Sequence, residues 1–294
     1  MRILITGSAG PAGRALLAQL RHMDHQLIGA DMAPADDSAW EAIETVPAAS
    51  DPSMLAVLAE LVRRHRIDLV IPTVADELPM VAEAAQQRRL GAPVVIGPVA
   101  GVTAAHDKLE TARALQAAGV PVPAFALPSE LPGPQEALSR FGGSLIVKPR
   151  SARGGRGVRL VESAQELDWE ACDDSQILQA FAPGTEYAPM VHVPHDGPET
   201  VVVVEKTALK EGRVGNAAAV RRLERGEAED VAQVAVEAVR ALGLTGPADL
   251  DIRRDAQGRP RVLEINARFG ANSEHAPEIL RAVLAQAAGS TGED

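Results

Sequence analysis

Hydrophobic and polar positions alternate with two different periods along the first hundred residues. Short runs of Ile, Leu and Val predict buried strands, and apolar residues three or four positions apart predict helices. The strands are expected at 2–6, 26–31, 67–73 and 92–97, and the helices at 11–23, 53–66 and 76–90. Strands that alternate with helices typically form a parallel sheet covered on both faces. Residues 1–100 are therefore expected to form an α/β domain.

The pattern changes after residue 100, where short strands follow one another. Helices are expected at 106–120 and 229–244, and each meets a glycine near its end, Gly119 and Gly243. The strands are expected at 144–150, 157–163, 176–183, 186–193, 200–209, 248–254 and 260–266. Successive strands joined by short turns predict antiparallel pairing, and hence an α+β fold for this half.

The composition excludes several classes of function. The 294 residues include 40 acidic and 29 basic side chains, for a net charge of −11, and aromatic residues make up 2%. Nucleic-acid binding needs a basic footprint and often aromatic platforms, so it is not expected. The lone Cys172 cannot form an internal disulfide, and no apolar stretch approaches the roughly 20 residues that span a bilayer. We therefore expect a soluble, cytoplasmic protein.

A glycine-rich turn follows the first expected strand. Gly7, Gly10 and Gly13 lie where the strand passes into a helix, and Asp31 ends the second strand. In dinucleotide-binding domains such a turn lets a phosphate approach the helix N-terminus, and an acid near this position holds a ribose. The turn alone is consistent with an NAD(P)-dependent enzyme, although such turns also serve only to pack a helix against a strand.

A second glycine-rich segment, VKPRSARGGRGV at 147–158, follows a buried strand that ends near Lys148. Glycines let backbone amides fold onto phosphate oxygens, and a lysine supplies a point charge for the same group. An exposed hairpin tip would explain the glycines but not their combination with Lys148. The segment therefore predicts a phosphate site.

The last two expected strands carry polar side chains on one face. In LEINAR, Glu264, Asn266 and Arg268 alternate with apolar residues, and Asp249 and Asp251 alternate in the same way on the preceding strand. Carboxylate and amide oxygens suit a Mg²⁺ ion that bridges nucleotide phosphates, and an arginine can clamp a phosphoryl group. The alternative is a solvated pair of strands with ordinary surface charges. Polar residues that share one face of otherwise apolar strands favour a metal site instead.

Together with Asp107 and Lys108, these segments resemble the ATP-grasp superfamily, most closely its ligases that are similar to the carbamoyl-phosphate synthase large subunit. The resemblance is carried by 147–158, by LQAFAPGTEY at 178–187 and by DLDIRRDAQGRPRVLEINAR at 249–268, and 3–13, 27–31 and 70–78 resemble the family's pre-ATP-grasp domain. The implied fold is a Rossmann-like pre-ATP-grasp domain at 1–100, followed by a small ATP-grasp subdomain at 101–176 and a large subdomain with the Mg/ATP site at 177–294.

The resemblance implies a role for each matching residue. For ATP, the positions are Lys108 and Lys148 for the phosphates, Ser151, Gly154, Gly155 and Gly157 for a mobile covering loop, Gln179, Ala180 and Phe181 for the adenine hinge, and Glu186 for the ribose. For Mg²⁺, or Mn²⁺ as an alternative, they are Asp251, Glu264 and Asn266, with Asp249 as a substitute for Asp251. Arg268 would steady the transferred phosphoryl group as a catalytic residue. Lys206, chosen over Lys210 and Arg213, would be the second catalytic residue and add a further phosphate contact.

The sequence also departs from the family pattern. Ala180 stands where many relatives have a glutamate, so adenine contacts there would rest on the backbone. The segment 269–279 lacks the serine- or glycine-rich run of near relatives, which leaves the substrates open. Asp76 and Glu77 suit either an amine substrate or the capping of a helix, and His275 suits either an acceptor contact or a solvated loop.

The activity implied by the resemblance is that of an ATP-dependent ligase. It would activate a small carboxylate as an acyl phosphate and join it to an amine, releasing ADP and phosphate. Its partners would be these two small molecules, with no nucleic acid and no membrane, and relatives are often homodimers. Two alternatives stay open, which are an NAD(P)-dependent oxidoreductase or epimerase that uses the N-terminal turn, and a nucleotide-binding module without catalysis.

Overall fold

Within the residues that the computed structural model describes, 1–33, 37–152 and 154–290, the strands form three sheets. The first is a parallel sheet with the strand order β3-β2-β1-β4. Its elements are β1 (Arg2–Thr6), α1 (Pro11–Leu20), β2 (Gln26–Asp31), β3 (Ala42–Thr45), α2 (Met54–His65), β4 (Leu69–Ile71) and α3 (Leu78–Gln86). The expected α/β domain is confirmed.

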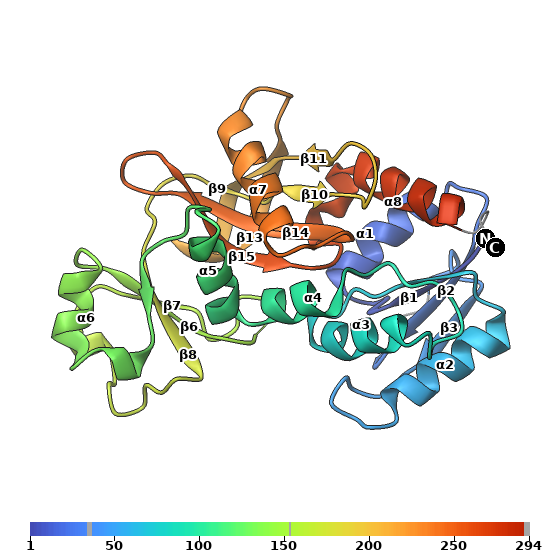
Figure 1. Cartoon of the computed structure of the whole chain (residues 1–294), viewed down its shortest axis with the longest axis horizontal. Coiled ribbons are helices and arrows are strands. Elements are labelled where there is room, and N and C mark those ends of the chain that lie inside the picture. Colours follow the sequence, from blue (N-terminus) through green and yellow to red (C-terminus); the bar gives the residue numbers. More distant parts are fainter. Residues whose placement is uncertain (34–36, 153, 291–294) are drawn as a thin grey trace.

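Alternate residues of these strands face two separate cores. Ile3 and Ile5 pack with Leu16 of α1 and with the C-terminal helix α8 (Pro277–Ser290), whereas Leu4 packs with α2 and α3. Because strand side chains point to opposite faces in turn, helices cover both sides of the sheet. Figure 1 shows α8 and α1 together on one side, so the C-terminal helix completes the N-terminal domain.

One expectation for this domain is wrong, and one strand was not expected. Residues 92–97 contribute an isolated bridge between Val70 and Val94 instead of a strand, because Pro93 has no amide proton for a ladder and Pro98 ends the segment. Conversely, β3 was not expected, since its partly exposed sequence AIET has no clear apolar alternation.

The helix expected at 106–120 begins two residues later and follows another helix. α4 (Val99–His106) and α5 (Lys108–Ala117) meet at Asp107, which has an extended backbone with φ −107° and ψ 114°. The Asp107 carboxylate accepts hydrogen bonds from the amides of Leu109 and Glu110 and so caps α5. Gly119, with φ 77°, lies just beyond the end of α5, as expected.

The second sheet is small and antiparallel, with the order β5-β8-β6-β7. Its elements are β5 (Phe125–Ala126), α6 (Pro134–Arg140), β6 (Leu145–Pro149), β7 (Arg159–Val161) and β8 (Gln176–Ala180). Leu138 of α6 packs with Leu145 and Leu178 in its core. β6 and β7 form the hairpin expected around the second glycine-rich segment.

The third sheet has seven strands in the order β11-β10-β14-β9-β12-β13, with β15 paired to β14. Its elements are β9 (Glu186–Tyr187), β10 (Met190–His192), β11 (Thr200–Val202), β12 (Val204–Glu211), β13 (Val214–Arg222), α7 (Glu229–Ala241), β14 (Pro247–Arg254) and β15 (Pro260–Asn266). Figure 1 shows the small sheet and α6 at one end of the molecule and the N-terminal sheet at the other, with the large sheet between them.

The packing divides the chain differently from the expected subdomain limits at two points. The limit between 176 and 177 falls inside β8, which pairs with β5 and β6 of the small sheet. α4 and α5, expected in the small subdomain, bury Val102 and Leu115 with Val239 of α7 in the core of the large sheet. These helices therefore join the N-terminal domain to the large sheet.

Candidate active site

A cleft of about 740 Å³ lies where the three sheets meet. Most of the residues singled out in the sequence line it, namely Lys148, Gly154, Gly155, Gln179, Ala180, Phe181, Glu186, Lys206, Asp251, Glu264, Asn266 and Arg268. The other three, Lys108, Ser151 and Gly157, lie outside the lining. A large cleft with converging polar groups is the usual form of a small-molecule site.

β14 and β15 bring the expected metal ligands together. Their antiparallel register pairs Asp251 with Glu264 and Asp249 with Asn266, and all four residues line the cleft. The turn between the strands has Gly258 at φ 77°, a left-handed conformation that favours glycine. Because directly opposed residues of such a pair are close neighbours, carboxylate and amide oxygens gather on one face.

Lys206 of β12 lies between two of the cleft's carboxylates. Its Nζ donates to Glu186 Oε1 and to Asp251 Oδ1, each at 2.6 Å, and its side chain is 6% exposed. Burial would lower the pKa of Lys206, but the carboxylates of Asp251 and Glu186 outweigh burial and raise it. Lys206 is therefore a fixed positive charge between the expected ribose and metal positions.

Two further buried lysines lie beside β15 of the same strand pair. Lys148 Nζ donates to Gln179 Oε1 and to the Leu263 carbonyl oxygen, each at 2.9 Å, and burial lowers its pKa to about 8. Lys108 Nζ donates to the Ala152 carbonyl oxygen at 3.0 Å and lies 3.5 Å from Glu264 Oε2. Both ammonium groups are thus held by protein oxygens beside the predicted metal position.

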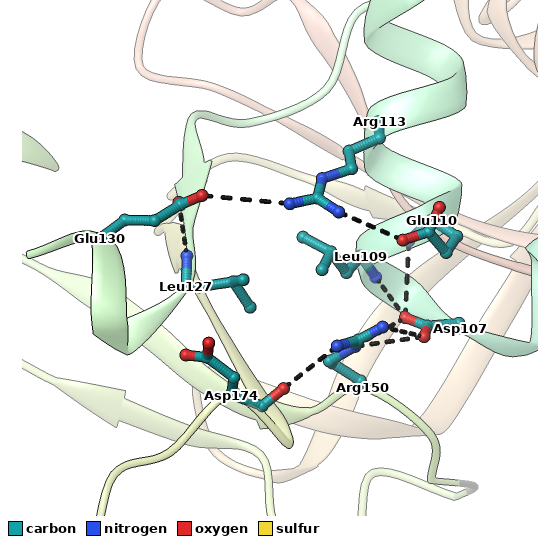
Figure 2. A network of polar contacts seen from close by, with 8 residues as sticks. All are labelled: Asp107, Leu109, Glu110, Arg113, Leu127, Glu130, Arg150 and Asp174. Carbon is teal, nitrogen blue, oxygen red and sulfur yellow. Dashed lines mark hydrogen bonds and ion pairs between the residues drawn. The ribbon is translucent and has the colours of Figure 1, made fainter.

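A polar network fixes the backbone from which Lys108 and the glycine-rich segment start. Arg150, just after β6, donates from Nε and Nη2 to the Asp107 carboxylate at 3.1 and 2.5 Å, and from Nη1 to the Asp174 carbonyl oxygen at 3.2 Å (Figure 2). The Lys108 amide donates to the Arg150 carbonyl oxygen at 2.9 Å. This two-point contact joins the start of α5 to the end of β6.

The glycines of the second segment serve backbone conformation. Gly154, Gly155 and Gly157 have φ values of 64°, 70° and 74°, which side-chain-bearing residues rarely adopt. A Cβ on Gly157 would also lie 2.9 Å from Pro149 Cγ, so this glycine is needed for packing on β6. The Gly154 carbonyl oxygen accepts a hydrogen bond from Asn216 Nδ2 at 3.0 Å, and residue 153 lies outside the described residues.

The adenine hinge expected around β8 has its amides already paired. The Ala180 amide donates to the Ala124 carbonyl oxygen at 2.8 Å, and the Phe181 amide to the Ser144 carbonyl oxygen at 3.4 Å. These two amides are therefore occupied in this conformation, and Phe181 presents its ring as a cleft-lining group. Base recognition through the backbone at these positions stays a prediction.

Phe181 is held by two arginines. The guanidinium carbons of Arg213 and Arg253 lie 4.7 and 4.9 Å from the ring centroid. Arg253 Nη1 also lies 3.4 Å from Glu186 Oε2, and Arg213 pairs with Glu162 at 2.7 Å. The ring and the expected ribose carboxylate are thereby fixed relative to each other.

Arg268 pairs with Asp249, so the two aspartates of β14 differ in role. Arg268 Nη1 donates to Asp249 Oδ2 at 3.1 Å and to the Phe269 carbonyl oxygen at 3.0 Å. Gly270 leaves room for this pair, since a Cβ there would lie 2.1 Å from Asp249 Oδ2. Burial raises the pKa of Asp249 against the opposing effect of Arg268. Asp251 instead faces Glu264 and pairs with Lys206, and its choice as the metal ligand stays a prediction.

The donor set fits the Mg²⁺ ion that the resemblance implies. Asp251, Glu264 and Asn266 offer hard oxygen donors on one face. Among the described residues, no group of three or more His, Cys, Asp or Glu side chains converges on one point. Mg²⁺ in nucleotide sites is commonly held by one or two carboxylates together with phosphates and water, so two carboxylates and an amide meet that need.

At the N-terminal glycine turn, the carboxylate of Asp31 accepts amide hydrogen bonds of the kind that a bound anion would accept. The Ala9 amide donates to Asp31 Oδ2 at 3.0 Å, and the Ala33 amide donates to Asp31 Oδ1 at 3.1 Å. A dinucleotide phosphate would have to share the amide-lined turn with this carboxylate. Gly13 is required for packing, because a Cβ there would lie 2.4 Å from the Gly7 carbonyl oxygen.

Of the three residues with open roles, Glu77 alone lines the cleft. Its carboxyl accepts hydrogen bonds from Thr6 Oγ1 and from the Val74 amide, the second of which caps the short helix at Ala75–Glu77. Burial raises the pKa of Glu77 to about 7, and the nearby charge of Asp31 adds to the effect. His275 lies outside the lining, 3.5 Å from Glu274.

Sequence reasoning missed Arg253, which lines the cleft together with Lys210 and Arg156. A signal for Arg253 was present, because 249, 251 and 253 alternate along one strand and so share a face. Lys210 depends on the irregular pairing of β12 with β13, where register shifts interrupt the alternation. No sequence pattern shows the result of such shifts.

Comparisons with known proteins agree with this geometry. A model described as an ATP-grasp domain matches residues 105–272, and one described as the NAD-dependent epimerase/dehydratase family matches residues 3–118. The second match covers the Rossmann-like part of the fold only. Within the described part of the chain, no helix has the length and apolar character needed to cross a membrane.

Individual relatives are ligases and synthases. A D-alanine–D-alanine ligase of Gloeobacter violaceus is 28% identical over 62% of this chain. The match covers 66% of that protein's length. A carbamoyl phosphate synthase large chain of Methanothrix thermoacetophila is 22% identical over 76% of this chain and 22% of its own length. The fold matches the structure of an L-amino acid ligase from Bacillus licheniformis with a TM-score of 0.71, at 21% identity over 93% of this chain and 68% of that one. Since the ATP-grasp model matches more than half of its residues, the chain belongs to the ATP-grasp family.

Proposed function

We propose that the protein is an ATP-dependent ligase that joins a small carboxylate to an amine and releases ADP and phosphate. One observation carries the proposal: buried ammonium groups and paired carboxylates face one cleft of about 740 Å³. A triphosphate requires cations, and its magnesium ion requires hard oxygen donors. The cleft offers both, side by side.

The nucleotide would lie along the junction of the small and large sheets. Its base would contact Phe181 and Gln179, its ribose would be bound by Glu186, and its phosphates would lie near Lys148 under the loop that contains Gly155. This placement is supported by the ATP-grasp match, whose range of 105–272 includes these residues, and by the cleft that they line.

Asp251, Glu264 and Asn266 would hold Mg²⁺, or Mn²⁺ with the same oxygen donors. When bound, the ion would neutralise negative charge on the phosphate oxygens. Lys206 already balances the charges of Asp251 and Glu186.

The reaction would proceed by two displacements. A carboxylate oxygen of the substrate attacks the γ-phosphorus, and the bond from phosphorus to the β–γ bridging oxygen breaks, which gives an acyl phosphate and ADP. The amine nitrogen then attacks the acyl carbon and loses a proton, and the bond to the phosphate oxygen breaks. Arg268 would steady the phosphoryl group with its positive charge, and no protein nucleophile is needed.

The other two readings receive less support. An NAD(P)-dependent enzyme would leave the lysines and the β14–β15 face without a purpose, and Asp31 competes for the amide-lined turn. A module without catalysis would not need Glu264, Asn266 and Arg268 together in the cleft. A cytoplasmic location and a homodimer, which the resemblance implies, stay predictions.

The direct test is a phosphate-release screen with MgATP in which amino acids are offered as the acid, and amino acids, their amides and simple amines are offered as the amine, followed by mass spectrometry of the product. We expect phosphate release that depends on both substrates, together with the mass of an amide. A protein that is stabilised by NADH and not by MgADP, and that releases no phosphate with any pair, would refute the proposal.

A further inference from the structure

The cleft has two electrostatically different parts. The described lining residues between Gly7 and Glu77 include two charged side chains, Asp31 and Glu77, both acidic. The remaining lining includes four acids, Glu186, Asp249, Asp251 and Glu264, but also six basic residues, which are Lys148, Arg156, Lys206, Lys210, Arg253 and Arg268. We call the lining between Gly7 and Glu77 the N-terminal subsite. A negatively charged group finds cationic partners in one part of the cleft and none among the described lining of the other.

Asp31 keeps capacity for a ligand. Its two carboxylate oxygens accept one hydrogen bond each, from the amides of Ala9 and Ala33. A carboxylate offers about four lone-pair sites, so each oxygen can accept one more donor. These amides also fix the direction of the carboxylate, and preorganised acceptors bind a cation at lower entropic cost.

The rest of the N-terminal subsite is largely apolar. Pro11, Met32, Val46, Pro47 and Met54 line it, and Met32 is 58% exposed, which is unusual for a large apolar side chain in this molecule. An apolar wall of this kind gains free energy by covering aliphatic or aromatic surface of a ligand. The wall and the two carboxyl groups therefore select for a ligand that is cationic and apolar at once.

We propose that the N-terminal subsite binds the amine acceptor of the ligase, and that this acceptor carries an apolar group and no free carboxylate. The inference rests on the proposed function. The ammonium form of the acceptor is bound by Asp31 and faces Glu77, and the same carboxylates can take up the proton that the nitrogen must lose before it attacks. A free carboxylate on the acceptor would lie beside the acids Asp31 and Glu77. Arg268 would not neutralise it, because Arg268 binds the phosphoryl group.

The test measures the melting temperature of the full chain with saturating MgADP, with and without matched probes. The pairs are leucinamide with leucine, and phenylalaninamide with phenylalanine, which differ in the free carboxylate. We expect each amide to raise the melting temperature at a concentration about tenfold or more below that of its acid. Asp31→Asn should abolish the response to the amides and keep the response to MgADP, and Asp37→Asn, an exposed acid outside the lining, should keep both.

The outcomes separate the two proposals. If MgADP stabilises the protein but the acids act as well as the amides, or neither acts, the inference is wrong while the proposed function stands. An amide response that survives in Asp31→Asn also overturns it. Absence of any MgADP response in the unaltered protein would instead count against the proposed function.

Discussion

Lys206 and Asp251 form an ion pair with 2.6 Å between Nζ and Oδ1. The same ammonium group contacts Glu186 at 2.6 Å, so one buried cation links the expected ribose carboxylate to the expected metal ligand. Without bound nucleotide, Lys206 offsets the repulsion between these two acids. The lysine therefore connects the stability of the cleft to its function.

Replacing Lys206 with Met should destabilise the protein, because two acids lose their shared counter-charge in a poorly solvated place. We expect a loss of about 3 kcal/mol in the free energy of unfolding, the lower end for a broken buried pair, since Arg253 stays within 3.4 Å of Glu186. Urea denaturation measures this. Lys210→Met, the same change at an exposed position of the same strand, should alter stability by no more than about 0.5 kcal/mol. Equal effects of the two variants would contradict this account of Lys206.

Glu264→Gln should leave the fold intact and abolish ligation, since the amide keeps the size of the side chain but removes its charge. We expect turnover to fall by a factor on the order of 100 or more, and removal of divalent metal with EDTA to stop turnover of the unaltered protein. Phosphate release and circular dichroism report activity and fold. Glu60→Gln, on the exposed face of α2 beside Arg63, is the control and should retain full activity. Unchanged turnover in Glu264→Gln would remove this residue from the metal site.

Glu77 should make stability fall as pH rises. Burial raises its pKa in the folded protein to about 7 from an ordinary 4.5, so between these values the folded form holds a proton that the unfolded form has lost. Stability contributed by this group is complete below about pH 4.5, declines up to about pH 7 and is then constant, a change of about 3 kcal/mol at 1.4 kcal/mol per unit.

Urea denaturation of Glu77→Gln over the same pH range checks this. The difference in stability between the unaltered protein and the variant should change by about 3 kcal/mol, because only the unaltered protein titrates at this position. The charge of Asp31 contributes to the raised pKa, so Asp31→Asn should weaken the pH dependence without removing it. Parallel stability curves for the unaltered protein and Glu77→Gln would show that Glu77 is ionised normally.

Gly270→Ala should disturb the pairing of Asp249 with Arg268. The added Cβ would lie 2.1 Å from Asp249 Oδ2, so the ion pair must shift, at a cost of about 2 kcal/mol in stability and with loss of turnover. Gly133→Ala is the matched control, because its backbone is extended at φ 167° and the space around it is open. A Gly270→Ala variant with normal turnover would show that Arg268 does not need Asp249.

Much of the fold follows from local patterns that the sequence makes plain. The alternation of short apolar strands with helices predicts the parallel domain, and the short turn between β14 and β15 predicts the antiparallel pair. The errors arise where local pattern and tertiary context disagree: Pro93 interrupts an apolar run, and β3 forms because it pairs with β2. The packing of α4 on the large sheet depends on contacts distant in sequence, which periodicity does not encode.

The candidate site likewise has features that local sequence patterns predict and features that depend on tertiary contacts. The face shared by Asp251, Glu264 and Asn266 can be read from alternation and one turn. The separation of Asp249 from Asp251 cannot, because it depends on Arg268 reaching back to β14 and on the space left by Gly270. Lys206 joins the site only through the pairing of β12 with β9, a contact between strands whose order in the sheet the sequence does not reveal.

The central claim is tested most directly by a crystal structure of the protein with MgADP. We expect electron density for the nucleotide between Phe181 and the β14–β15 pair, with its metal ion bound by oxygens of Asp251 and Glu264. A nucleotide bound instead at the turn of Gly7 and Gly10, with those carboxylates facing solvent, would contradict the account.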